Sequence, residues 1–167
     1  KKMVASESEK KVYDVLNEIG IKYEKYTHKP VYTVEDVNKL DVHIPGNHTK
    51  NLFLRNRKGN IHYLVVMKDS KRADLKKLSK QVGSTPLSFA SEKRLEKYLG
   101  LKPGSVSPFG LVNDSGKCVK VIIDSDILKG EKIGFHPNVN TATLVISTGD
   151  FQKFLKWTEN DVSYMKI

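Results

Sequence analysis

The chain contains 167 residues, 38% of them hydrophobic, which is enough to bury one core without disulfide bonds or a structural metal. Its single cysteine excludes an internal disulfide, and no stretch approaches the roughly 18 apolar residues that a membrane-spanning helix needs. We therefore expect one domain over residues 1–167, cytoplasmic and without a membrane partner. The 29 Lys and Arg residues exceed the 19 Asp and Glu residues by ten, which favours a polyanionic partner.

The first half of the chain predicts a helix followed by a strand, a short helix and a β-hairpin. The first helix covers residues 6–20, where Ser6 and Glu9 have the spacing of a capping box and Gly20 ends the apolar stripe. The elements after it are expected at residues 21–28, 33–40, 51–56 and 61–67. The last two flank a glycine-containing turn, which is the pattern of a hairpin.

The second half predicts further helices and strands around a loop rich in Gly, Ser and Pro at residues 101–114. Apolar periodicity predicts helices at residues 72–83, 91–100 and 149–157, and strands at residues 86–90, 118–124, 141–147 and 162–167. Cys118 begins an apolar run, so we expect a small buried side chain there. Grouped strands with interspersed helices favour an α/β domain built on a mixed sheet.

The positive charge is concentrated in the middle third of the chain. Residues 50–102 contain 14 Lys and Arg but only 4 Asp and Glu, whereas the remainder holds equal numbers of both signs. A local field of this size favours binding to a polyanion such as a nucleic acid. The alternative is a lysine-rich helix face that is simply solvated.

Familiar catalytic and metal-binding signatures are mostly absent. The chain has no CxxC, HExxH or GxSxG motif. Residues 110–117 are similar to a phosphate-binding loop, but five residues separate the glycines where four are required, and Cys118 stands where Ser or Thr would bind magnesium. His43 and His48 lack a matching set of Cys or carboxylate ligands, which makes a weak case for zinc. We expect no metal and no cofactor.

Three short stretches could line a ligand pocket. Lys50 and Asn51 open a strand, where the lysine can offer its charge to a phosphate or carbonyl and the asparagine can both donate and accept. Gly104 and Pro108 bracket small residues in a loop whose N–H groups can approach a ligand closely. His136 stands on a rigid polar loop ahead of a core strand. Each stretch alone has an ordinary explanation: a solvated strand end, a turn, or a hydrogen-bonded histidine on a turn.

Four longer segments contain these residues in a recognisable order. They are HKPVYTVEDV at 28–37, HTKNLFLRNRKGNIHYLVVMKDSKRADLKKL at 48–78, LGLKPGSVSPFGLVND at 99–114 and GFHPNVNTATLVISTGDFQKFL at 134–155. In these segments the chain closely resembles the YbaK/ProX family of aminoacyl-tRNA editing domains, specifically the ProX-like branch that works on tRNA for proline. The resemblance implies a single α/β domain: a mixed, strongly curved β-sheet with helices packed around it.

The resemblance also implies an activity, the hydrolysis of the ester between a wrong amino acid and the terminal adenosine of tRNA. It assigns the catalytic residues of the family to Lys50, Gly104 and His136, with Asn51 and Pro108 as substrate-binding neighbours. An aminoacyl ester is already activated, so positioning a water and stabilising the oxyanion could suffice without a metal or a covalent nucleophile.

The resemblance leaves the substrate and the partners open among several alternatives. An editing pocket must exclude proline, so alanine attached to tRNA for proline is the expected substrate, and cysteine on the same tRNA is the alternative. The domain could also be a catalytically silent module that docks tRNA or senses proline. Besides the mischarged tRNA, a further partner is prolyl-tRNA synthetase, either in the same chain or as a separate protein.

The basic middle third then has an expected partner in the acceptor stem of tRNA. The side chains expected to bind it lie on two consecutive predicted helices and just ahead of the first. They are Lys71, Arg72, Lys76, Lys77, Lys80, Lys93, Arg94 and Lys97.

Overall fold

The computed structural model of the protein describes residues 2–30 and 44–167, and side chains from residue 7 onward within those ranges. The strands are β1 (Glu24–Thr27), β2 (Thr49–Arg55), β3 (His62–Lys68), β4 (Ser88–Phe89), β5 (Val119–Asp124), β6 (Lys132–Phe135), β7 (Ala142–Ser147) and β8 (Val162–Met165). The α-helices are α1 (Lys2–Glu18), α3 (Leu75–Val82), α4 (Glu92–Leu99) and α5 (Thr148–Thr158), with short 3-10 helices η1 (Pro108–Asn113) and η2 (Ser125–Leu128). None of these helices is long and apolar enough to cross a membrane.

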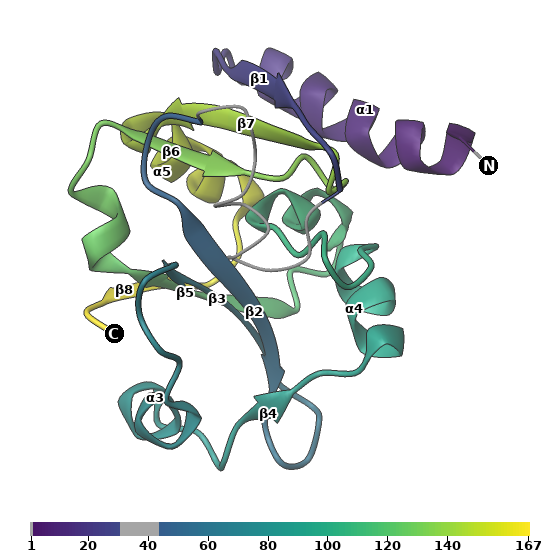
Figure 1. The fold of residues 1–167 in the computed structure, drawn as a ribbon. Helices are drawn as coiled ribbons and strands as arrows, with labels where there is room; N and C mark the ends of the chain where they lie inside the picture. The colour runs from purple at the N-terminus through teal and green to yellow at the C-terminus, as the bar shows by residue number, and fades with distance from the viewer. Residues whose placement is uncertain (1, 31–43) are drawn as a thin grey trace.

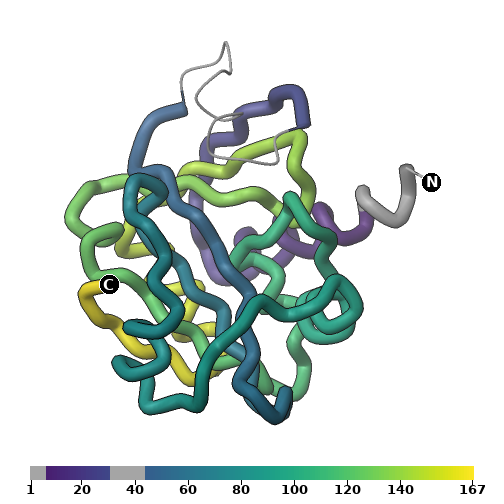
Figure 2. Tube along the Cα trace, turned by 60° about the horizontal axis from the view of Figure 1, so that its bottom comes forward, coloured from purple at the N-terminus to yellow at the C-terminus, as the bar shows by residue number. Residues whose placement is uncertain are grey.

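The strands form two sheets, so the α/β class is confirmed while the single sheet we expected is divided (Figure 1). One sheet has the order β1-β7-β6 and is antiparallel throughout. The other has the order β4-β2-β3-β5-β8, with an antiparallel β2–β3 hairpin and parallel pairing of β3, β5 and β8. The start of α1 and the end of β8 lie on opposite sides of the molecule (Figures 1 and 2).

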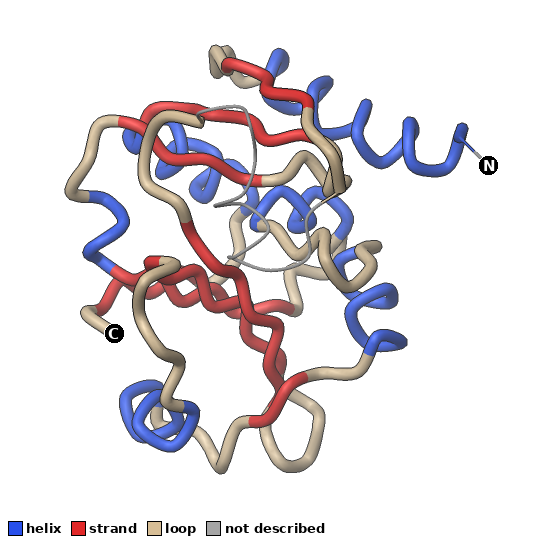
Figure 3. The backbone as a smooth tube through the Cα atoms, viewed as in Figure 1, coloured by secondary structure: helices blue, strands red, loops and turns tan. Residues whose placement is uncertain are grey.

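Most predicted elements are confirmed to within a few residues. For α4, the residues that begin and end the helix are both predicted correctly. The Ser91 hydroxyl accepts a hydrogen bond from the Arg94 backbone N–H, and Gly100 adopts φ +64° at the helix C-terminus. These are the cap and stop that the sequence indicates. The loop at 101–114 contains η1, which the sequence did not predict (Figure 3).

Two expectations are wrong, one strand was not predicted, and one expectation lies outside the described residues. The first helix begins at Lys2, so Ser6 is inside α1 and is not its N-cap. β6 was not predicted at all. Cys118 is exposed, because it belongs to the turn before β5 and burial begins only at Val119. The short helix expected at 33–40 lies outside the described residues.

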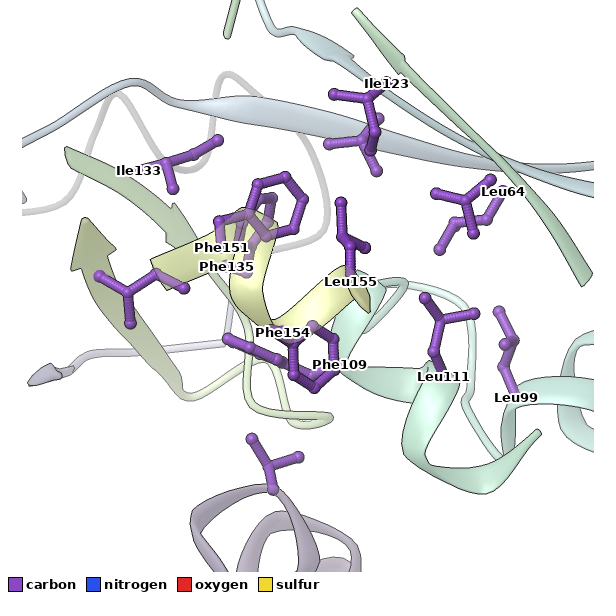
Figure 4. Close-up of a cluster of buried hydrophobic side chains, with 14 of the residues drawn as sticks. Leu64, Leu99, Phe109, Leu111, Ile123, Ile133, Phe135, Phe151, Phe154 and Leu155 are labelled. Carbon is purple, nitrogen blue, oxygen red and sulfur yellow. The ribbon is translucent and has the colours of Figure 1, made fainter. Parts of the chain in front are cut away.

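The main hydrophobic core lies between the two sheets and is centred on α5. Figure 4 shows Phe151, Phe154 and Leu155 of this helix pointing into the cluster. Phe109 of η1 contacts Phe154 edge to face, with ring centroids 5.2 Å apart. Phe135 at the end of β6 packs against Phe151 at 4.7 Å. Burial of each large side chain contributes roughly 1.5–3 kcal/mol, so this cluster is the main source of stability.

A second, smaller core covers the opposite face of the five-stranded sheet. Leu78 of α3 packs there with Leu54 of β2 and Val65 of β3. Alternation along β2 divides the strand between the two cores, because Phe53 faces the main core whereas Leu52 and Leu54 face α3.

The main core provides the first testable prediction. Phe109 is fully buried, so Phe109→Ala leaves a cavity and should lower the free energy of unfolding by about 3–5 kcal/mol. Urea denaturation of the purified chain measures this loss. The control is Phe89→Ala at a side chain that is 61% exposed, where the loss should be less than about 1 kcal/mol. Equal losses for the two variants would contradict this description of the core.

Candidate active site

A small cavity lies where the segment before β2, the strand β2 itself and the β6–β7 pair meet. Its volume is about 60 Å³. The described residues that line it are Ile44, His48, Thr49, Asn51, Asp69, Gly134, Phe135, His136 and Thr143. Two of the sequence-predicted site residues, Asn51 and His136, therefore meet at one cavity.

The wall before β2 is held against β6 by backbone contacts that need a glycine. Gly46 has φ +91°, and a Cβ there would lie 2.9 Å from backbone atoms of Lys132. Because L-residues rarely adopt this φ and the space is absent, any larger residue would push the wall away. The Asn47 N–H donates to the Lys132 carbonyl at 2.9 Å, and Gly134 N–H donates to the Asn47 carbonyl at 3.3 Å.

His136 follows β6 directly, and a hydrogen bond to Ala142 orients its ring. Nδ1 lies 2.9 Å from the carbonyl oxygen of Ala142, which can only accept, so Nδ1 carries the proton. In the neutral ring Nε2 is therefore an unprotonated acceptor. Burial lowers the pKa of His136, the hydrogen bond to Ala142 opposes this, and nearby His28 lowers it further. The net shift is downward, which keeps the ring neutral at pH 7.

Asn51 and Lys50 are adjacent in β2 but differ in their relation to the cavity. Asn51 lines it, and its Oδ1 is buried without a hydrogen-bond partner among the described residues. Lys50 is half-buried and pairs with Met67 of β3. It is not among the described lining residues, and strand alternation directs it to the face that carries Leu52.

Among the described residues, the Gly104–Pro108 loop is linked to the cavity through core packing and does not line it. Gly104 adopts φ +87°, a conformation that favours glycine. Pro108 begins η1, and the next residue, Phe109, contacts Phe135 edge to face at 5.8 Å. Neither Gly104 nor Pro108 is among the described lining residues. The loop thus supports the residue that precedes His136.

Sequence reasoning missed His28, Thr143 and Asp69. His28 Nε2 lies 2.9 Å from the Thr143 hydroxyl, and the His28 and His136 rings are 6.1 Å apart. Asp69 and Thr143 line the cavity. Thr143 could have been noticed, because it is a polar side chain in the buried run of β7. Within the described ranges, no group of three His, Cys, Asp or Glu side chains could hold a metal ion.

Two of the basic residues expected to bind tRNA have internal partners instead. Lys71 Nζ lies 3.0 Å from Asp124 and 2.6 Å from Asp126. Arg94 donates to the Gly59 carbonyl at 2.8 Å and lies 3.0 Å from His62 Nε2. Burial, aided by Arg94, lowers the pKa of His62 to about 4, so this ring is a neutral acceptor.

The other six basic residues are exposed on or beside the two helices, which lie on either side of β4 in Figure 1. They are Arg72, Lys76, Lys77, Lys80, Lys93 and Lys97. The structure thus leaves six of the eight side chains exposed for the binding that the sequence predicts.

The fold and the cavity agree with a family match that covers most of the chain. A family model described as the aminoacyl-tRNA editing domain matches residues 28–154. The chain belongs to this family, which confirms the resemblance seen in the sequence.

Two individual relatives and one solved structure are similar to this chain over most of their length. The prolyl-tRNA editing protein ProX of Acetoanaerobium sticklandii is 44% identical over 152 residues, which is 91% of this chain and 93% of the relative. The mouse prolyl-tRNA synthetase associated domain-containing protein 1 is 36% identical and covers 95% of this chain and 96% of its own. The solved structure of a candidate trans-editing enzyme for prolyl tRNA synthetase shares the fold, with a TM-score of 0.71, 20% identity and coverage of 96% and 97%.

The environment of His136 predicts its titration. Because burial lowers the pKa, the ring should titrate below 6.5 and carry its neutral-state proton on Nδ1. NMR of the ring nitrogens across pH 4–8 measures both properties, and His136→Asn assigns the signal. A midpoint at or above 6.5 would contradict the dominant effect of burial on this pKa, and a proton on Nε2 would contradict the hydrogen bond to Ala142.

Proposed function

We propose that this chain hydrolyses the ester that joins a wrongly attached small amino acid to tRNA for proline. The observation that carries the proposal is the 44% identity, over nearly the whole of both chains, to a prolyl-tRNA editing protein. The cavity adds support, because Asn51 and His136, which the family resemblance assigns to the site, line it together. Prolyl-tRNA synthetase, in the same chain or as a separate protein, is the proposed source of the mischarged tRNA.

The chemistry requires an oriented water and a place for negative charge to develop. The unprotonated Nε2 of His136 can accept a hydrogen bond from a water or from the 2′-hydroxyl of the terminal adenosine. This orients the attacking oxygen toward the ester carbonyl. Because the ester is activated, orientation of this kind does not require a covalent nucleophile. A metal ion is not part of the proposal.

Lys50 and the Gly104 loop are proposed to act from the edge of the site. The Lys50 ammonium can neutralise the phosphate before the terminal adenosine while Asn51 faces the aminoacyl group. The loop at Gly104 supplies backbone N–H groups that can stabilise the oxyanion if the bound acceptor end reaches it. These roles rest on the family resemblance and on the positions of the residues in β2 and before η1.

Alanine is the proposed amino acid, because the cavity is small and proline adds a ring. Cysteine is close in size and is the second candidate. Serine should enter and react more slowly, since its side chain differs from that of alanine by only one hydroxyl, a small difference that a pocket rejects only moderately. A module that binds tRNA without catalysis is the competing proposal.

A panel of aminoacyl-tRNAs tests the proposed activity. Tritiated alanine, serine, cysteine and proline are attached to the same tRNA for proline and incubated with the chain with and without EDTA. We expect fastest release of alanine, slower release of serine, no release of proline, and no effect of EDTA. Fastest release of cysteine would change the assigned substrate, and release of proline would exclude an editing role.

The same assay includes Lys50→Ala, which should reduce the rate of alanine release at least about tenfold, or ~1.4 kcal/mol of transition-state stabilisation. The exposed Lys153 on α5 provides the control. Lys153→Ala removes the same charge at a residue that is not among the described lining residues, so the rate should be unchanged. Full activity in Lys50→Ala would contradict the role proposed for this lysine.

The exposed lysines of α3 predict how binding depends on salt. Replacing Lys76, Lys77 and Lys80 together by Glu should weaken tRNA binding and reduce its salt dependence, because three phosphate contacts are lost. Filter binding from 50 to 200 mM salt measures both quantities. Circular dichroism checks the fold. Unchanged affinity would show that these lysines are only a solvated helix face.

A further inference from the structure

Phe89 is an exposed aromatic ring that belongs to neither hydrophobic core. The side chain is 61% exposed, and none of the ring-to-ring contacts within the described ranges involves it. In the described part of the chain, the other large hydrophobic side chain with high exposure is Tyr164, at 44%. Tyr164 lies on β8, at the opposite edge of the five-stranded sheet. Phe89 is therefore alone on its side of the molecule.

Hydrogen bonds fix the backbone on both sides of Phe89. Before the ring, the Leu87 N–H donates to the Ser79 hydroxyl of α3 at 2.9 Å. After the ring, the Ala90 N–H donates to the Phe53 carbonyl of β2, also at 2.9 Å. A ring on an anchored backbone has little conformational freedom to lose when a ligand packs against it.

The pairing of β4 with β2 places Phe89 on the same face of the sheet as Lys50. Phe89 lies opposite Leu54, and directly opposite residues of an antiparallel pair point to the same side. Alternation along β2 brings Leu52 and Lys50 to that side as well. Lys50 is four residues from Leu54, which is roughly 13 Å along the strand. A strand of nucleic acid that starts at Lys50 and follows β2 on this face therefore passes the ring.

Exposed cations surround β4 on three elements. The turn of the β2–β3 hairpin lies beside the segment that leads into β4, because the Arg57 N–H donates to the Thr85 hydroxyl at 3.1 Å. This turn adds the exposed side chains of Arg57 and Lys58 to the six cations on and beside α3 and α4, the helices that flank β4 (Figure 1). The exposed acidic side chains there are Asp74, Glu92 and Glu96, so the surroundings of the ring carry a positive charge.

A nucleic acid fits this combination better than a protein does. Surfaces that dock proteins present contiguous apolar patches, whereas here a single ring stands among charges. A nucleic-acid strand offers its phosphates to the cations and the flat faces of its bases to an aromatic ring. In a duplex these faces are already stacked on their neighbours. Only an unpaired nucleotide can therefore use the ring.

We propose that Phe89 is a stacking platform for an unpaired base in the 3′ strand of the tRNA acceptor end, upstream of the terminal adenosine. The proposal rests on the proposed editing function and names a residue that positions its substrate. With Lys50 at the phosphate before the terminal adenosine, the 3′ strand runs along this face of β2 toward the acceptor stem and meets the ring. Stacking tolerates every base, so the platform orients the strand without reading its sequence.

A binding experiment with two RNA hairpins tests the platform without any hydrolysis. Both hairpins copy the acceptor stem of tRNA for proline and carry no amino acid. One keeps the unpaired 3′ nucleotides and the other ends in a blunt duplex. Phe89→Ala should bind the first hairpin about tenfold more weakly than the wild type does, because the stacking of a base is lost, and should bind the blunt hairpin equally well. Fluorescence anisotropy with labelled hairpins measures the affinities.

Three results of this experiment would overturn the proposal. They are an unchanged affinity of Phe89→Ala for the first hairpin, an equal loss for both hairpins, and an absence of binding by the wild type. The salt dependence gives a second measurement. Its slope should be the same in Phe89→Ala as in the wild type, because no phosphate contact is lost. A smaller slope would mean that the substitution disturbs the basic surface, and it would contradict the stacking role.

Other substitutions separate stacking from an ordinary apolar contact. Phe89→Trp should retain the affinity for the first hairpin. Phe89→Leu should lose about as much as Phe89→Ala, because leucine is apolar but has no aromatic face. Tyr164→Ala, at the exposed ring on the opposite edge of the sheet, is the matched control and should bind as the wild type does. Full affinity in Phe89→Leu would overturn the assignment of a stacking platform.

This proposal and the proposed function fail separately, because binding is measured with RNA that carries no amino acid. Alanine release from tRNA with unchanged binding in Phe89→Ala would leave only the deacylase. Binding that depends on Phe89 without any alanine release would leave only the platform. Where both hold, Phe89→Ala should raise the KM for alanyl-tRNA about tenfold and change kcat less than about twofold, as expected for a contact made equally in the ground and transition states.

Discussion

The edge-to-face contact between Phe109 and Phe135 is the interaction on which the site depends. The two rings lie 5.8 Å apart at 85°, and Phe135 is held from its other side by Phe151. Phe109 follows directly after the Gly104–Pro108 loop, and Phe135 directly precedes His136. One packed pair therefore fixes the loop and the histidine relative to each other. Since a shift of 1 Å in a catalytic group can lower a rate about 100-fold, the close packing of this core determines the geometry of the site.

The sequence predicts best those elements whose ends are set by residues within the same segment. α4 was predicted at both ends because Ser91 and Gly100 satisfy its terminal groups within the same segment. β6 was not predicted, because its four residues include Gly134 and it exists through pairing with β7 and a bridge to Asn47. A strand that short has no periodicity of its own, and its partners supply the information.

The residues of the candidate site likewise fall into those that the sequence predicts and those that it does not. Asn51 and His136 could be predicted from the family resemblance, and both line the cavity. Strand alternation puts adjacent residues on opposite faces of a strand, so Lys50 and Asn51 could not both have been expected to face one cavity. The contact between His28 and Thr143 joins residues 115 positions apart, and no local pattern indicates it. The net charge can be counted from the sequence. The internal partners of Lys71 and Arg94, in contrast, could not be predicted from it.

The order of strands has a consequence for how the protein forms during synthesis. The β2–β3 hairpin can close as soon as it leaves the ribosome, whereas β3 must wait for β5 and β5 for β8. β1 waits longer still, since Tyr26 pairs with Thr143. Such a topology has a high contact order and closes slowly, because loop entropy is lost before the distant contacts form. The nascent chain therefore exposes an unpaired, apolar edge of β3 until β5 is made, and then an unpaired edge of β5 until β8 is made. During these intervals it is vulnerable to aggregation.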